Sequence, residues 1–191
     1  MFNVRVCLLF GFFVIPALVL CFESGEYVLP VMLAYTVHEA GQIAAAKMLG
    51  MDIAEIRFGA LGIRMKGNMQ MLSPLRRAAI SLSGPLTNLL FFILLLPFGP
   101  AWYAAELLLF VFHILPAVPL DGGMALYSAL SSIEPERRAA HQCTAISAVL
   151  AFLLGALGFS VLLRSKGNFT LLVTACYILI YIFKKHREDL C

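Results

Sequence analysis

The sequence predicts an all-α polytopic membrane protein of about six transmembrane helices, with a short cytoplasmic β-hairpin between the second and the third. Of its 191 residues, 61% are hydrophobic and 13% are charged, a balance that does not suit a soluble domain. Several apolar segments reach the roughly 17 to 25 residues that cross a bilayer as a helix. All positive charges except Arg164 and Lys166 fall on one side of these segments. We therefore expect one membrane domain over residues 1–191, with both termini in the cytoplasm.

Six spans are expected because apolar runs alternate with polar or helix-breaking residues. They are Val6–Phe22, Tyr27–Leu49, Ala78–Pro97, Ala101–Leu115, Cys143–Leu163 and Phe169–Phe183. The first run is interpreted as a retained span, since no cleavage site of small residues follows it. An irregular stretch and a short helical piece ending near Ser131 should separate the fourth span from the fifth.

The polar interval between the second and third spans, Met51–Gly67, predicts β structure. Within it, Ile63–Lys66 alternates apolar and polar residues, the period of a half-buried strand, and Gly59 and Gly62 suit bends. We expect a short β-hairpin at the cytoplasmic membrane surface. It is either a structural connector or a strand edge that pairs with an extended segment of another chain.

His38 and Glu39 lie near the middle of the second span, where ionisable groups are costly. Each charge in hydrocarbon costs roughly 2.5 kcal/mol or more, so such residues are retained for a partner or a function. On a helix His38 and Gln42 share one face, while Glu39 lies about 100° round. This is the arrangement of a zinc-binding His-Glu-x-x-His helix, except that Gln42 replaces the second histidine.

A second candidate site surrounds Asp121. Pro116 and Pro119 should end the preceding helix, and Gly122 and Gly123 permit backbone conformations closed to other residues. Irregular backbone at membrane depth is tolerated only where it is buried in protein or lines a wet cavity. A carboxylate at this break should therefore point inward, which makes Asp121 a candidate metal ligand.

These residues together suit a catalytic zinc ion, which takes about three protein ligands and one water molecule. His38 and Asp121 fill two ligand positions, and Glu39 is suited to accept a proton from the water. Zinc lowers the pKa of bound water towards ~7, which supplies a nucleophile in dry surroundings. Peptide hydrolysis within the membrane is then chemically feasible.

Three separated motifs resemble those of the site-2 protease family of intramembrane zinc metalloproteases. They are a His-Glu-x-x-His helix at His38–Gln42, an Ala/Ser-Gly-Pro-x-x-Asn segment at Ser83–Asn88, and an Asn-x-x-Pro-x-x-Pro-x-Asp-Gly-Gly segment at His113–Gly123. Their order and spacing are similar to the compact six-span branch that includes the bacterial sporulation-factor-processing enzymes. The resemblance implies that His38 and Asp121 bind one Zn²⁺ ion per chain and that Glu39 is the catalytic base.

The resemblance also implies a supporting role for the second motif, in which Asn88 helps the helix carrying Gly84 and Pro85 pack beside the site. It further implies a bacterial cell membrane as the location. The substrate would be a membrane-associated or membrane-spanning protein segment, and control would come from a membrane partner or from substrate access. The net charge of +3 is too small and too dispersed to indicate nucleic-acid binding.

The chain departs from the family pattern at two positions, with Gln42 where histidine is expected and His113 where asparagine is expected. A glutamine carbonyl is a poor zinc ligand beside imidazole. His113 could replace the lost ligand, or Gln42 could serve as a weak one. Alternatively, the protein is an inactive pseudoprotease that binds membrane partners, or a transporter-like protein whose buried ionisable groups line an ion path.

Glu106 is a further carboxylate in a predicted span, five residues into the fourth. Trp102 and Tyr103 precede it, and such aromatic residues are enriched where helices meet the membrane–water interface. We therefore expect Glu106 at the outer interface.

Overall fold

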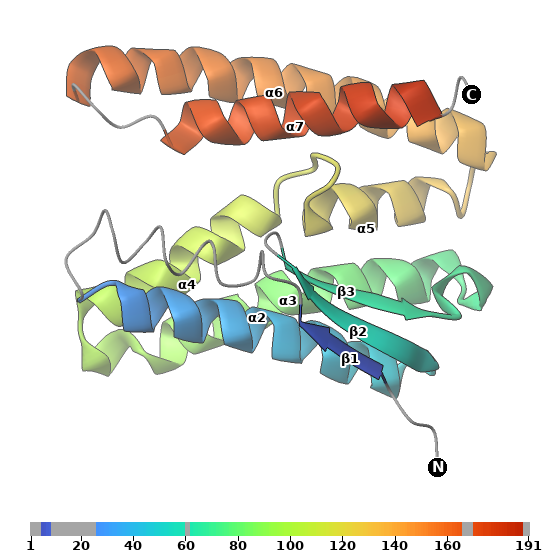
Figure 1. Ribbon diagram of the computed structural model, residues 1–191, viewed down its shortest axis with the longest axis horizontal. Helices are drawn as coiled ribbons and strands as arrows, with labels where there is room; N and C mark the ends of the chain where they lie inside the picture. The colour runs from blue at the N-terminus through green and yellow to red at the C-terminus, as the bar shows by residue number, and fades with distance from the viewer. Residues whose placement is uncertain (1–4, 9–25, 60–61, 166–169, 189–191) are drawn as a thin grey trace. The chain divides into compact units, whose positions relative to one another are not determined.

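The computed structural model describes residues 5–8, 26–59, 62–165 and 170–188 (Figure 1). These residues are mostly helical and include one small sheet. They divide into two compact units, Met1–His113 and Ile114–Cys191.

The first unit is built on three helices, α2 (Val28–Met48), α3 (Pro74–Leu94) and α4 (Pro100–His113), each of which packs against the other two. Short 3-10 helices precede α3 (η2, Met69–Met71) and link α3 to α4 (η3, Leu96–Phe98). Gly99 makes the turn into α4 with a φ of 116°, a conformation that favours glycine. The expected second, third and fourth spans are therefore confirmed as helices, with boundaries shifted by a few residues.

A three-stranded sheet lies beside these helices, with strand order β1 (Arg5–Leu8), β2 (Ile53–Gly59), β3 (Gly62–Gly67). The strands β2 and β3 form the expected antiparallel hairpin, in which Ile56 is opposite Met65. These two residues pack against a core cluster from α2, α3 and the connecting segments: Ala46, Met51, Ile53, Leu72 and Ile80. The hairpin is thereby anchored to the helices by apolar burial.

The remaining strand of the sheet, β1, was not predicted, because Val6–Phe22 was expected to be a helical span. Val6 to Leu8 instead pair in parallel with β2, so no helix begins at Val6. The rest of that expected span lies outside the described residues. An apolar run is compatible with either a buried strand or a helix, and here pairing with the distant β2 determines the outcome.

The second unit contains α5 (Asp121–Leu130), α6 (Glu136–Ser165) and α7 (Thr170–Glu188), with α5 and α7 each packing against α6 (Figure 1). Small residues allow a close approach of α6 and α7. A Cβ atom at Gly158 would lie 2.8 Å from the backbone nitrogen of Leu172, so α7 passes directly over this glycine.

Among the described residues, two helical segments are long and apolar enough to cross a membrane, Pro74–Leu94 and Glu136–Arg164. A shorter apolar segment, Leu171–Lys184, lies in α7. Large apolar side chains such as Phe152 and Phe183 are well exposed on α6 and α7, a surface suited to lipid rather than to water. Membrane crossing by α2 and α4, and the total of six spans, stay predictions.

Candidate metal centre

His38 lies in the middle of α2 with its imidazole almost fully buried against α3. Its ring occupies the space that a side chain at position 84 would need. A Cβ atom built on Gly84 would lie 2.6 Å from Nε2 and 2.7 Å from Cε1 of His38. The glycine of the Ser83–Asn88 motif therefore makes room for the candidate ligand itself.

Asn88 follows Gly84 by four residues and so lies on the same face of α3. Its side chain is fully buried, and its Oδ1 lies 2.6 Å from Nδ1 of His38. The Asn88 amide nitrogen donates to the carbonyl oxygen of Ala34 at 2.9 Å and to Oε2 of Glu106 at 2.5 Å. The role predicted for Asn88 was helix packing, whereas the structure places it in direct contact with His38.

This network assigns the tautomer of His38. Because the Asn88 oxygen can only accept, Nδ1 of His38 must carry the proton and donate. The other ring nitrogen, Nε2, then carries the lone pair, as an imidazole ligand requires. The Asn88 contact thus prepares His38 to bind a metal ion through Nε2.

Gln42 follows His38 by one turn of α2, and its Nε2 lies 3.4 Å from Nε2 of His38. In this orientation the amide group points its nitrogen, a donor, towards the lone pair of His38. A zinc ligand would have to present the carbonyl oxygen instead. The arrangement favours a hydrogen-bonding role for Gln42 over a role as ligand.

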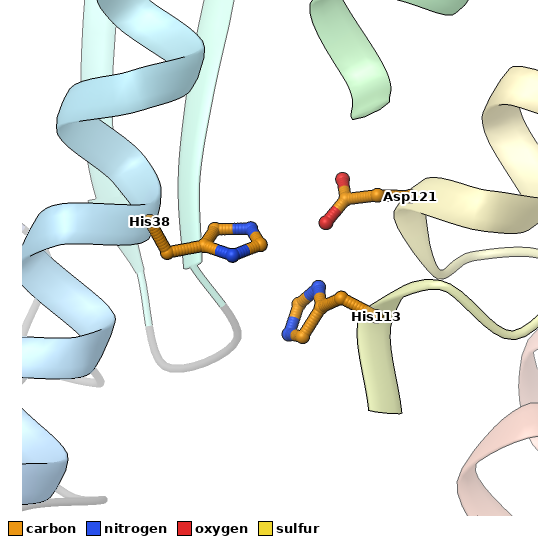
Figure 2. A group of neighbouring side chains, drawn as sticks. All are labelled: His38, His113 and Asp121. Carbon is orange, nitrogen blue, oxygen red and sulfur yellow. The ribbon is translucent and has the colours of Figure 1, made fainter. Parts of the chain in front are cut away.

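His113 is the last residue of α4 and lies against His38 (Figure 2). The two ring centroids are 4.3 Å apart, with the rings inclined at 54°. One nitrogen of each ring lies within 4.8 Å of the other. Two nitrogens on the same tetrahedral zinc ion lie about 3.3 Å apart, so a modest rotation of one ring brings both to bonding distance. The pair of imidazoles fits a zinc ion.

Glu39 is also buried in α2, and the Tyr35 hydroxyl, one turn earlier, donates a hydrogen bond to its carboxylate. Two residues further along α2, Gly41 faces Thr87 of α3 so closely that any side chain at position 41 would collide with it. The α2 segment that carries His38 and Glu39 is therefore held directly against α3.

Asp121 belongs to the second unit, where it is the first residue of α5 (Figure 2). The segment that precedes it folds back over the start of the helix. Side chains at Gly122 and Gly123 would collide with the backbone of residues 114–118, so both glycines are required by close approach. The predicted irregular stretch is confirmed, and it includes Pro119, which follows Val118.

Ser147 of α6 fixes this irregular segment. Its hydroxyl accepts a hydrogen bond from the backbone nitrogen of Val118 at 2.8 Å and donates to the carbonyl oxygen of Cys143 at 2.6 Å. Ser147 is fully buried, so both bonds are made out of contact with solvent. Ser147 could not be identified from the sequence, because nothing in the pattern pairs position 147 with the loop.

Glu106 was expected at the outer interface, and this expectation is wrong. Its side chain is fully buried and bonded to Asn88, because α4 packs on α3 along this face. Its second oxygen, Oε1, has no hydrogen-bond partner among the described residues. The neighbouring aromatic residues suggested an interface, but the helix face on which Glu106 lies is inward.

These helices and the sheet form the site-2 protease fold. The chain is similar to the solved structure of the site-2 protease from Methanocaldococcus jannaschii, with a TM-score of 0.64 and 22% sequence identity. The match covers 96% of this chain and 91% of that one. No protein-family model matches the sequence, and no curated protein does. The resemblance inferred from the three motifs is confirmed in the fold.

Proposed function

We propose that this protein is an integral membrane zinc metalloprotease that hydrolyses a peptide bond in or near a membrane-spanning segment of a substrate protein. The observation that carries the proposal is the pair of adjacent imidazoles, the buried His38 and the half-buried His113. In that pair the Asn88 contact places the ring proton of His38 on Nδ1, so that Nε2 carries the lone pair. The site-2 protease fold supports the proposal that this pair binds zinc.

The metal ligands in this proposal are His38, His113 and Asp121, within one membrane domain over residues 1–191. Two imidazoles and one carboxylate form a usual ligand set for catalytic zinc. Gln42, in the position of the missing histidine, acts as a hydrogen-bond donor. When bound, zinc supplies a Lewis acid that polarises water and a peptide carbonyl.

Glu39 carries the proton transfers. As general base, its carboxylate takes a proton from the water whose oxygen bonds to the peptide carbonyl carbon. As general acid, it returns that proton to the amide nitrogen when the carbon–nitrogen bond breaks. The hydrogen bond from Tyr35 holds the carboxylate in place for both steps.

The proposed setting of this activity rests on the fold, on the charge distribution and on the resemblance of the three motifs. The protein would be a multi-pass protein of a bacterial cell membrane with cytoplasmic termini, and its substrates would be membrane proteins. The central strand β2 is paired with β1 on one side and with β3 on the other. A substrate strand would therefore add to the outer edge of β3 or of β1. A membrane partner or substrate access would control cleavage.

One observation favours a second candidate, an inactive pseudoprotease that binds membrane partners. Gln42 presents its nitrogen to the lone pair of His38, and this contact is compatible with a site that does not take up metal. The two candidates share the fold and differ in zinc content and cleavage.

The proposal is tested by cleavage in proteoliposomes that contain a mixture of single-span membrane proteins, with new N-termini identified by mass spectrometry. Glu39→Gln should abolish cleavage and leave the zinc content unchanged, because the amide cannot accept the proton. The matched control is Glu136→Gln at an exposed position in α6, which should cleave as wild type does. Cleavage that persists in purified Glu39→Gln protein would exclude this mechanism.

A further inference from the structure

A buried carboxylate beyond the candidate ligands extends the network around His38. Glu106 is fully buried in α4, and its Oε2 accepts a hydrogen bond from the Asn88 amide nitrogen. The Asn88 amide oxygen in turn accepts the proton on Nδ1 of His38. Glu106 thus reaches the candidate metal ligand through one intervening amide, from a helix that the sequence analysis did not connect to it.

We infer that Glu106 is a positioning residue, which fixes the Asn88 amide and thereby holds His38 in the tautomer that carries its proton on Nδ1. The use of the Nε2 lone pair by a metal ion rests on the proposed function. The tautomer itself does not, since it follows from the hydrogen bonds of the first unit alone.

The tautomer of His38 depends on which way the Asn88 amide faces. An asparagine amide has a donor end and an acceptor end, and only its hydrogen-bond partners distinguish the two. The Asn88 nitrogen faces two acceptors, the Ala34 carbonyl oxygen and the Glu106 carboxylate. Rotating the amide by half a turn would place its oxygen against both of these oxygens. The Glu106 carboxylate therefore selects the orientation in which oxygen faces His38.

Glu106 is needed for this selection because the Ala34 contact alone holds the orientation of the Asn88 amide only weakly. The Ala34 carbonyl belongs to α2 and lies four residues before His38, so it is the regular helical acceptor for the His38 backbone nitrogen. If Glu106 is replaced by an apolar residue, the Asn88 amide loses one of its two acceptors. Its nitrogen can then face Nδ1 of His38, which would move the ring proton to Nε2.

Packing alone does not explain a glutamate here. A buried carboxylate is costly unless it is bonded, and Oε1 of Glu106 has no hydrogen-bond partner among the described residues. An apolar side chain of similar size would fill the same space without this cost. The glutamate is explained by its other oxygen, Oε2, which accepts a hydrogen bond from Asn88 and fixes the orientation of that amide.

The experiment measures the tautomer of His38 directly in the metal-free, full-length protein. The four histidines are labelled with ¹⁵N, and long-range ¹H–¹⁵N correlation spectra identify which ring nitrogen carries the proton. The His38 signal is assigned by its absence in His38→Gln. The variants compared are Glu106→Gln, whose side-chain oxygen can still accept from Asn88, and Glu106→Leu, which has no acceptor. Leu108→Ala, at an exposed position of the same helix, is the matched control.

We expect the proton on Nδ1 in wild type, in Leu108→Ala and in Glu106→Gln, and a shift towards Nε2 in Glu106→Leu. Zinc affinity should fall about 10- to 100-fold in Glu106→Leu and be restored in Glu106→Gln.

A wild-type or Glu106→Gln spectrum with the proton on Nε2 overturns the inference, and neither measurement requires Glu106→Leu to fold. A folded Glu106→Leu protein with the wild-type tautomer also overturns it. Failure of wild type to bind zinc while His38 keeps its proton on Nδ1 refutes the proposed function and leaves this inference standing.

Discussion

Replacing Gly84 with alanine should disrupt the candidate metal centre without removing any polar group. The new Cβ atom would lie 2.6 Å from Nε2 of His38, whereas ordinary contacts begin at 3.4 Å. The ring must therefore retreat by about 0.8 Å, or the helices α2 and α3 must separate by a similar amount. Either movement lengthens the 2.6 Å contact between His38 and Asn88.

The expected magnitude has two parts. Overpacking in a buried site costs about 1 to 3 kcal/mol in the free energy of unfolding. Displacing a ligand and its supporting contact reduces metal affinity about 10- to 100-fold. Zinc affinity is measured by competition with a chelator in detergent, and stability by thermal unfolding of the metal-free protein.

The matched control is Gly155→Ala in α6, another substitution of a helical glycine. Its Cβ atom would lie 3.7 Å from the Cβ atom of Ala175, an ordinary contact, so zinc affinity should be unchanged. Stability should be unchanged or up to about 1 kcal/mol greater, since alanine favours the helix. A Gly84→Ala protein that binds zinc as tightly as Gly155→Ala would refute the role given to Gly84.

Two further substitutions test how the elements that carry the site are held. Gly41→Ala should lower the free energy of unfolding of the metal-free protein by about 1 to 3 kcal/mol, because the methyl group collides with Thr87; unchanged thermal unfolding would contradict the close helix contact. Ser147→Ala should cost about 1 to 3 kcal/mol by leaving the buried Val118 nitrogen without its partner. Faster amide hydrogen exchange at Val118 would report this loss, and unaltered exchange would count against it.

The parts of the fold that could be predicted from sequence are those governed by local pattern. Apolar runs located α2, α3 and α4 to within a few residues, and alternation at Ile63–Lys66 located the hairpin. The strand β1 was missed because its partner, β2, lies about 50 residues away. No local pattern encodes such a pairing, which depends on the edge that β2 offers.

The candidate site divides in the same way. His38 and Glu39 could be identified because ionisable residues in an apolar segment are costly, and that cost can be read from the sequence. Glu106 could not be linked to them, since its contact with Asn88 depends on how α4 packs on α3. The direct contact between Asn88 and His38 was missed for the same reason. The motif identified Asn88, but only the packing of α2 on α3 gives its partner.

The central claim is that His113 replaces the ligand lost at Gln42. It is tested most directly by the zinc content of the detergent-purified protein, measured in parallel in wild type and His113→Ala. We predict about one zinc ion per chain in wild type, as for a single catalytic site, and loss of that zinc in His113→Ala. Absence of zinc from wild type, together with its appearance in Gln42→His, would contradict the claim and identify a protein that acts by binding alone.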